Sequence, residues 1–101
     1  MDANEIINKA LNSNYVIIDE EELKTVLDNS EIIRVEDTYL SDFIRVLNYN
    51  DKLFVQELTF KKEIVIRKMN SIIDADQFVQ ERLDFYERKW DGCGCKINYY
   101  E

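Results

Sequence analysis

The chain contains no histidine and no proline, and its 101 residues include only two glycines and two cysteines. Without histidine it cannot build a Ser-His-Asp triad, a Cys-His pair or a histidine-ligated metal site. Neither Gly92 nor Gly94 stands between a predicted strand and a helix, so a P-loop and a dinucleotide-binding turn are also excluded. These absences remove the commonest catalytic machineries, and we expect a non-catalytic protein without a cofactor.

Long apolar runs are also missing. No run approaches the roughly 20 residues that a membrane helix needs, and the acidic, amphipathic start of the chain does not resemble a secretory signal. Two cysteines suit a reducing compartment, because small secreted domains usually carry more of them. The sequence therefore predicts a cytoplasmic protein that does not act at a membrane.

Positive charge is scarce: 13 basic residues face 21 acidic ones, for a net charge of −8. Residues 1–50 hold 11 acids and 4 bases, whereas residues 51–101 hold 10 acids and 9 bases. Such a balance opposes long-range attraction to nucleic acid, so we expect no direct nucleic-acid binding. The acidic first half suits either a basic partner or simple solubility, and the sequence alone favours solubility.

The N-terminal third of the chain predicts two short amphipathic helices. The chain is 46% hydrophobic and has no repeat or linker, so we expect a single domain over residues 1–101. Residues 2–12 and 19–29 fit helices capped by Asp2 and Asp19, with a strand at 14–18 between them. Glu22 stands three residues after Asp19, which makes a carboxylate form of the capping box.

Between residues 31 and 69 the pattern changes to runs rich in Ile, Val, Phe and Tyr, which are typical of strands. Asn50-Asp51 and Lys61-Lys62 mark turns between such runs. The short spacing favours an antiparallel meander over parallel β-α-β units. In the run 52–60 both alternating faces carry apolar residues, which indicates a sheet partly covered on both sides, or one whose second side is an interface.

From about residue 74 to residue 91, apolar residues recur every three or four positions and predict a long helix. Asp74 and Asp76 suit its positive N-terminal end, and Gly92 suits the position just after its last turn. The sequence thus predicts an α+β fold. Its antiparallel meander of four or five strands carries two short N-terminal helices, and one long C-terminal helix packs on one face.

All the glycines and cysteines lie together in residues 92–95. In an extended Cys-Gly-Cys segment both sulfurs point to one side, with Cα atoms about 6.5–7 Å apart, whereas disulfides prefer about 5.5–6 Å. A bond between Cys93 and Cys95 is therefore expected to be strained and easily reduced. Lys96 favours a thiolate, although the helix C-terminal dipole opposes one. One alternative function is therefore thiol redox chemistry at these three residues, with Trp90 tuning the site.

The other alternative at Cys93 and Cys95 is a soft metal ion, Zn(II) or Cu(I). A closed zinc site needs four ligands, so two chains would have to share one ion across a symmetric dimer. A structural interpretation also stands, in which the two cysteines are small residues in a tight turn between the helix and a final short strand.

Aromatic residues gather near the C-terminus, where Trp90, Tyr99 and Tyr100 are close in sequence. Aromatic anchors dominate protein interfaces, so we predict these three as binding residues, while core filling is the competing explanation. The function that the sequence favours is a small acidic protein that binds another macromolecule, most simply a protein. Self-association as a homodimer is a further option.

Overall fold

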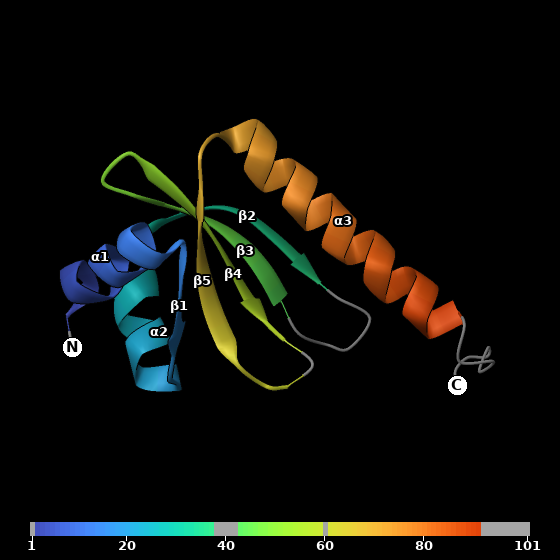
Figure 1. The fold of residues 1–101 in the computed structure, drawn as a ribbon, viewed down its shortest axis with the longest axis horizontal. Helices are drawn as coiled ribbons and strands as arrows, with labels where there is room; N and C mark the ends of the chain where they lie inside the picture. Colours follow the sequence, from blue (N-terminus) through green and yellow to red (C-terminus); the bar gives the residue numbers. More distant parts are fainter. Residues whose placement is uncertain (1, 38–42, 60, 92–101) are drawn as a thin grey trace.

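The computed structural model describes residues 2–37, 43–59 and 61–91, with side chains as far as Phe85 (Figure 1). The described residues form three helices and five strands. In chain order they are α1 (Ala3–Ser13), β1 (Tyr15–Ile18), α2 (Glu20–Asp28), β2 (Glu31–Asp37), β3 (Phe43–Tyr49), β4 (Lys52–Leu58), β5 (Ile64–Met69) and α3 (Ile72–Asp91).

The five strands form one antiparallel sheet in the order β1-β5-β4-β3-β2. Strands β2 to β5 follow one another as the predicted meander, and β1 closes the far side by pairing with β5. The predicted α+β architecture is therefore confirmed, with the sheet at the upper end of the expected size.

Both predicted turns are present, and each contains residues with positive φ. Asn50 and Asp51 have φ values of 51° and 66°, as in the two-residue hairpin turns whose twist matches that of paired strands. Lys62 has a φ of 66°, and its N–H donates to the Thr59 carbonyl. These two turns set the spacing of β3, β4 and β5.

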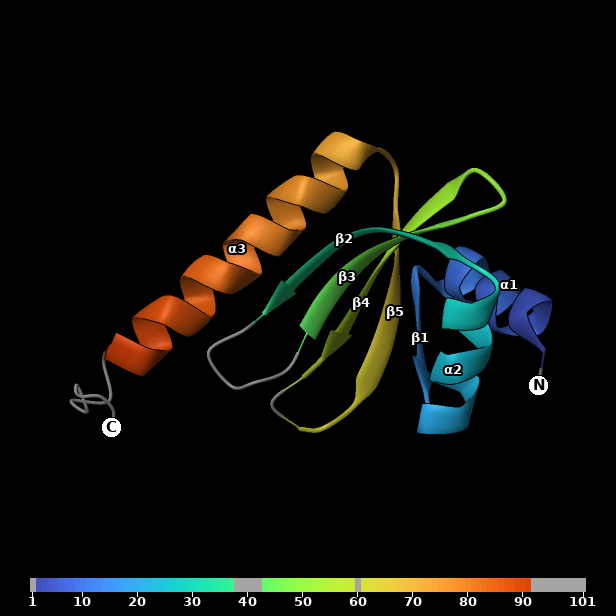
Figure 2. The same ribbon diagram turned by 180° about the vertical axis from the view of Figure 1, so that it is seen from behind.

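One face of the sheet is covered by α1 and α2, which lie together on the same side (Figures 1 and 2). Their buried residues Ile6, Ala10 and Val26 join Phe54 and Ile66 of the sheet in one hydrophobic cluster. The predicted stripe of α1 is confirmed, because apolar positions three and four residues apart face the sheet. We call this side the α1/α2 face.

The opposite face is covered by α3, which lies on the other side of the sheet from α1 and α2 (Figures 1 and 2). Ala75 and Val79 of this helix pack on Ile44, Val46 and Val55. Adjacent residues of β4, such as Phe54 and Val55, therefore point into separate clusters. This confirms the first interpretation of the mixed β4 pattern, since the middle of the sheet is covered on both sides.

The long helix begins two residues earlier than the sequence pattern indicated, at Ile72 rather than Asp74. Ser71 explains the difference, because its Oγ accepts a hydrogen bond from the N–H of Asp74 at 3.1 Å. Its carbonyl also accepts the first helical bond, from Ala75. Asp74 therefore lies in the first turn, where its charge favours the positive end of the helix.

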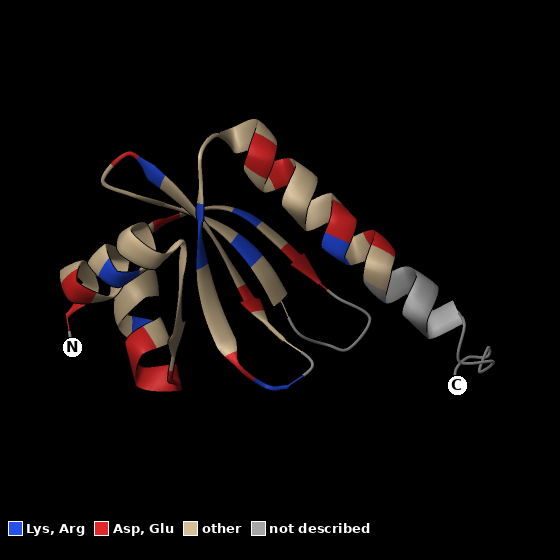
Figure 3. Ribbon diagram, in the orientation of Figure 1, with Lys and Arg blue, Asp and Glu red and all other residues tan. Residues whose placement is uncertain are grey.

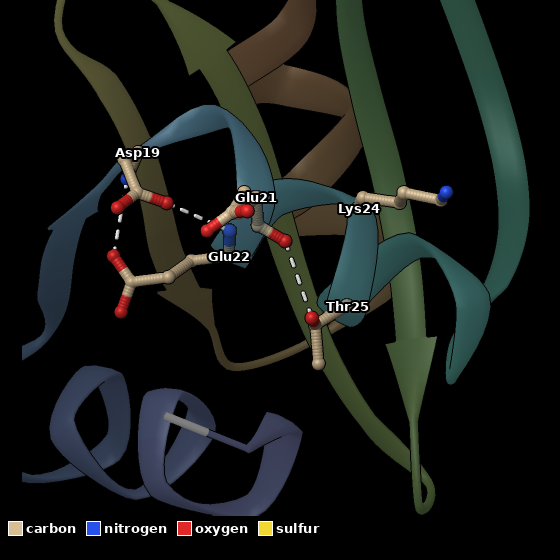
Figure 4. A pocket seen from close by; sticks show the side chains of 5 residues that line it. All are labelled: Asp19, Glu21, Glu22, Lys24 and Thr25. Atoms are coloured by element: carbon tan, nitrogen blue, oxygen red, sulfur yellow. Dashed lines mark hydrogen bonds between the residues drawn. The ribbon is translucent and has the colours of Figure 1, made fainter.

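The start of α2 confirms the predicted capping box (Figure 4). The N–H of Glu22 donates to Asp19 Oδ1 at 2.8 Å, and the N–H of Asp19 donates to Glu22 Oε1 at 3.1 Å. Two amides without helical partners are thereby satisfied. Asp2 and Glu5 make the same reciprocal pair at the start of α1.

Replacing Asp19 with alanine is expected to lower the free energy of unfolding by about 1 kcal/mol, because the Glu22 amide loses its acceptor. The matched control is Asp19→Asn, which keeps an acceptor oxygen and should stay within a few tenths of a kcal/mol of the original chain. Urea unfolding followed by circular dichroism measures both variants. Equal losses in the two would show that the side-chain charge, rather than the cap bond, stabilises this end.

Candidate functional site

The outer strand β2 is the most exposed strand of the sheet, and its outer edge is not paired with any described strand. It is seven residues long, pairs only with β3, and exposes three large apolar side chains, those of Ile32, Ile33 and Val35. An unpaired strand edge presents backbone N–H and C=O groups that can bind another extended segment. We call this element the β2 edge.

The register of β2 against β3 assigns its side chains to the two faces. Ile32 lies opposite Leu47 and Val35 opposite Arg45, on the α1/α2 face. Arg34 lies opposite Val46, on the face that carries α3. Along β2, the α1/α2 side is therefore largely apolar, whereas Glu31, Arg34 and Glu36 make the α3 side charged.

A register shift interrupts β2 between Ile32 and Arg34, where Ile33 is the extra residue. Such bulges increase local twist and are one way in which natural sheets limit uncontrolled edge pairing. The charged residues of β2 act in the same direction. The β2 edge therefore has no second partner among the described strands, and it carries two features that disfavour indiscriminate pairing.

A hollow of about 370 Å³ lies on the α1/α2 face, at the end of the sheet where α2 begins. Its apolar lining is Leu23 of α2 together with Phe43, Leu58 and Ile64 of three adjacent strands. Phe43 is 44% exposed and pairs with Asp37, the last residue of β2. The hollow therefore adjoins the β2 edge and can receive side chains of a segment bound there.

The polar residues of the hollow are Glu20, Arg45 and Gln56. An N–H of Arg45 donates to the Gln56 side-chain oxygen, and the guanidinium lies 5.3 Å from the centre of the Phe43 ring. This stacking keeps the Arg45 guanidinium against the apolar lining of the hollow. Glu20 adds a carboxylate at the rim.

A cluster of three charged residues ties β2 to α3. Arg34 Nε lies 2.8 Å from Glu36 Oε2, and Arg34 Nη1 lies 3.1 Å from Asp76 Oδ1. The hydrogen bond to Glu36 is the main reason that the pKa of Arg34 is raised, and the bond to Asp76 adds to it against the effect of burial. Arg34 therefore stays charged at every ordinary pH and remains engaged by its two carboxylates.

Glu57 is the most deeply buried charged residue among those described, at 1% exposure. Its Oε2 lies 2.8 Å from Arg67 Nε, and its Oε1 lies 3.2 Å from Arg82 Nε on α3. The second contact lacks hydrogen-bond geometry and is electrostatic. Both guanidinium groups lie within 5.6 Å of the centre of the Phe78 ring. The network explains how α3 is fixed on the sheet, and we assign it a structural role.

The other sheet edge, β1, differs from the β2 edge in length. It has only four residues, although Tyr15 and Ile17 are about half exposed. Short edge strands give an added segment little backbone to pair with. Ile17 therefore provides a natural control position for experiments on β2.

The acidic start of α2 lines a second hollow, with Asp19, Glu21, Glu22, Lys24 and Thr25 at its wall (Figure 4). Asp19 and Glu22 are engaged in the capping box. This agrees with the interpretation of the acidic run as a helix start. Among the described residues, no group of three or more Cys, Asp or Glu side chains is placed to hold a metal ion.

The binding and redox residues predicted from the sequence cannot be compared with this site. Cys93, Cys95, Lys96, Tyr99 and Tyr100 lie outside the described residues, and Trp90 is described only as part of the α3 backbone. Their proposed roles in binding, redox chemistry or metal sharing stay predictions. Sequence reasoning did not single out the β2 edge, because an edge position follows from the order of the strands in the sheet.

The fold and the site define a small α+β domain in which an apolar hollow lies beside a sheet edge that no described strand covers. No known protein family model, curated protein or solved structure matches the chain. None of the helices in the described part of the chain is long and apolar enough to cross a membrane.

Proposed function

We propose that this protein acts without catalysis by binding another polypeptide, and that the β2 edge with its adjoining hollow is the binding surface. A single observation carries the proposal: seven residues of outer strand expose Ile32 and Val35 on the same face as the hollow. In this mode of binding, an extended segment of the partner adds to the sheet as a further strand. Its main-chain hydrogen bonds supply affinity, and its alternate side chains supply specificity. The few cysteines support placing this function in the cytoplasm.

A photo-crosslinking side chain placed at position 33 tests the proposal in the cells that make the protein. We expect a discrete adduct with another polypeptide, because Ile33 is exposed at the free edge. The matched control is the same side chain at position 17, since Ile17 is 50% exposed but lies on the short β1 edge. Denaturing electrophoresis and mass spectrometry identify the adduct.

Three other outcomes would contradict this assignment. Equal yields of adduct from positions 33 and 17 would show that the exposure of the side chain alone determines which polypeptides are crosslinked. An adduct of twice the chain mass would identify a second copy as the occupant of the edge. A link within one chain to residues 92–101 would show that the protein covers its own edge.

A further inference from the structure

The charged side of the β2 edge carries more acidic than basic side chains. Glu31 and Glu36 flank Arg34 on the α3 side, and Asp37 ends the strand beside the hollow. Figure 3 shows acidic residues at the arrowhead of β2 and in the first turns of α2 and α3. An added segment therefore meets a net negative charge on the α3 side, where Glu31, Glu36 and Asp76 outnumber Arg34, and mainly apolar side chains on the other side.

The cations near this edge are already engaged within the chain. Arg34 is held between Glu36 and Asp76, and Arg45 is bonded to Gln56. In contrast, Glu31 and Asp37 are exposed, and neither forms an ion pair with any residue in the described ranges. The edge thus offers unneutralised negative charge to an incoming strand.

From this arrangement we infer that the partner is an extended segment of a basic protein, in which apolar residues alternate with lysine or arginine. The inference rests on the proposed function and specifies its partner. Residues of a strand alternate between faces, so apolar side chains of the segment lie beside Ile32 and Val35, on the face that holds the hollow. Its basic side chains on the α3 side face Glu31, which forms no ion pair with a described residue, and opposite charges on adjacent strands are favourable.

A second copy of the chain fits this edge less well. Its own β2 would bring the same excess of carboxylates, and the assembly would combine two chains of net charge −8. Like charges on adjacent strands are unfavourable, and Arg34 is already engaged by two carboxylates. A basic segment instead neutralises the edge and the acidic half of the chain around it.

Selection from a randomised decapeptide library displayed on phage tests the inference with the full-length protein as bait. We expect the selected peptides to alternate apolar residues with lysine or arginine. Synthetic copies should bind at least about fivefold more weakly to the Val35→Lys variant, which loses an apolar contact and adds a like charge. The control is Ile17→Lys, because Ile17 (50% exposed) matches Val35 (47% exposed) on the opposite edge.

A second pair of variants tests the charge alone. Glu31→Gln removes an exposed carboxylate of β2 and should weaken binding of the basic peptides about twofold to fivefold, with the difference shrinking as salt is raised. The control Glu21→Gln removes an exposed carboxylate of α2 and should leave the affinity unchanged. Fluorescence anisotropy with labelled peptides measures all four variants.

The outcomes separate this inference from the proposed function. Neutral or acidic peptides that depend on Val35 would overturn the basic partner and leave binding at the β2 edge standing. Peptides that bind Val35→Lys and Ile17→Lys equally, or no selected peptides at all, would overturn both. A dimer in light scattering that Val35→Lys dissociates would assign the edge to a second copy.

Discussion

The Phe54→Ala variant is expected to lose about 3–5 kcal/mol of unfolding free energy, which is the range for removing a buried phenylalanine. Phe54 has no exposed surface and is the largest fully buried side chain among the described residues. It lies in the centre of the sheet, beneath α1 and α2, where neighbouring side chains cannot all close the resulting cavity. Because domains are stable by only about 5–15 kcal/mol, this variant should be close to unfolding at body temperature.

The control for this prediction is Phe43→Ala. The same side chain is removed, but Phe43 is 44% exposed at the rim of the hollow, so stability should change by less than about 1 kcal/mol. Thermal unfolding measures both, since about 4–8 °C of melting temperature corresponds to each kcal/mol in a domain of this size. If both variants lost the same stability, the assignment of Phe54 to the core would be wrong.

The second large effect concerns the ion pairs beneath α3. Replacing Arg67 and Arg82 together with methionine should cost about 3–5 kcal/mol, because the buried Glu57 loses both partners. The Glu57→Met variant should stay within about 1 kcal/mol of the original chain, because it removes the buried charge itself and leaves no unpaired charge that is fully buried. Its two arginines are about one-third exposed and can turn toward water.

Combining all three substitutions provides the decisive comparison. Adding Glu57→Met to the double arginine variant should recover most of the lost stability, because no unpaired carboxylate then remains in the interior. Urea unfolding of the four proteins measures the coupling. If the triple variant is no more stable than the double variant, the loss of unfolding free energy comes from lost packing of the aliphatic parts of the two arginines. The unpaired charge of Glu57 would then not be its cause.

Much of the fold could be predicted because local signals and packing agree. Asp19 with Glu22 marked a helix start, Asn50-Asp51 marked a hairpin, and the spacing of apolar residues marked α3. Two details of the fold were not visible in the sequence. The pairing of β1 with β5 joins segments almost 50 residues apart, and only the packed structure specifies it. The burial of Glu57 is the other such detail, because its partner Arg82 is distant in sequence.

The candidate site was harder to predict because an edge strand is a property of the sheet order. The residue types of 31–37 suit an inner strand as well as an outer one. Only the order β1-β5-β4-β3-β2 leaves this strand without a second partner among the described strands. The Cys-Gly-Cys tail attracted the chemical hypotheses because its composition is unusual. The binding surface that we propose lies elsewhere, at β2 and the hollow beside it.

The pairing of β1 with β5 has a consequence for how the chain folds as it is made. Strand β1 leaves the ribosome early, together with α1 and α2, but its hydrogen-bonding neighbour comes only with residues 64–69. Until then the apolar sides of both helices lack the completed sheet on which they pack. Closing such a long loop slows folding and prolongs the exposure of apolar, aggregation-prone surface. Nascent chains of this protein should therefore depend on chaperones until β5 has been translated.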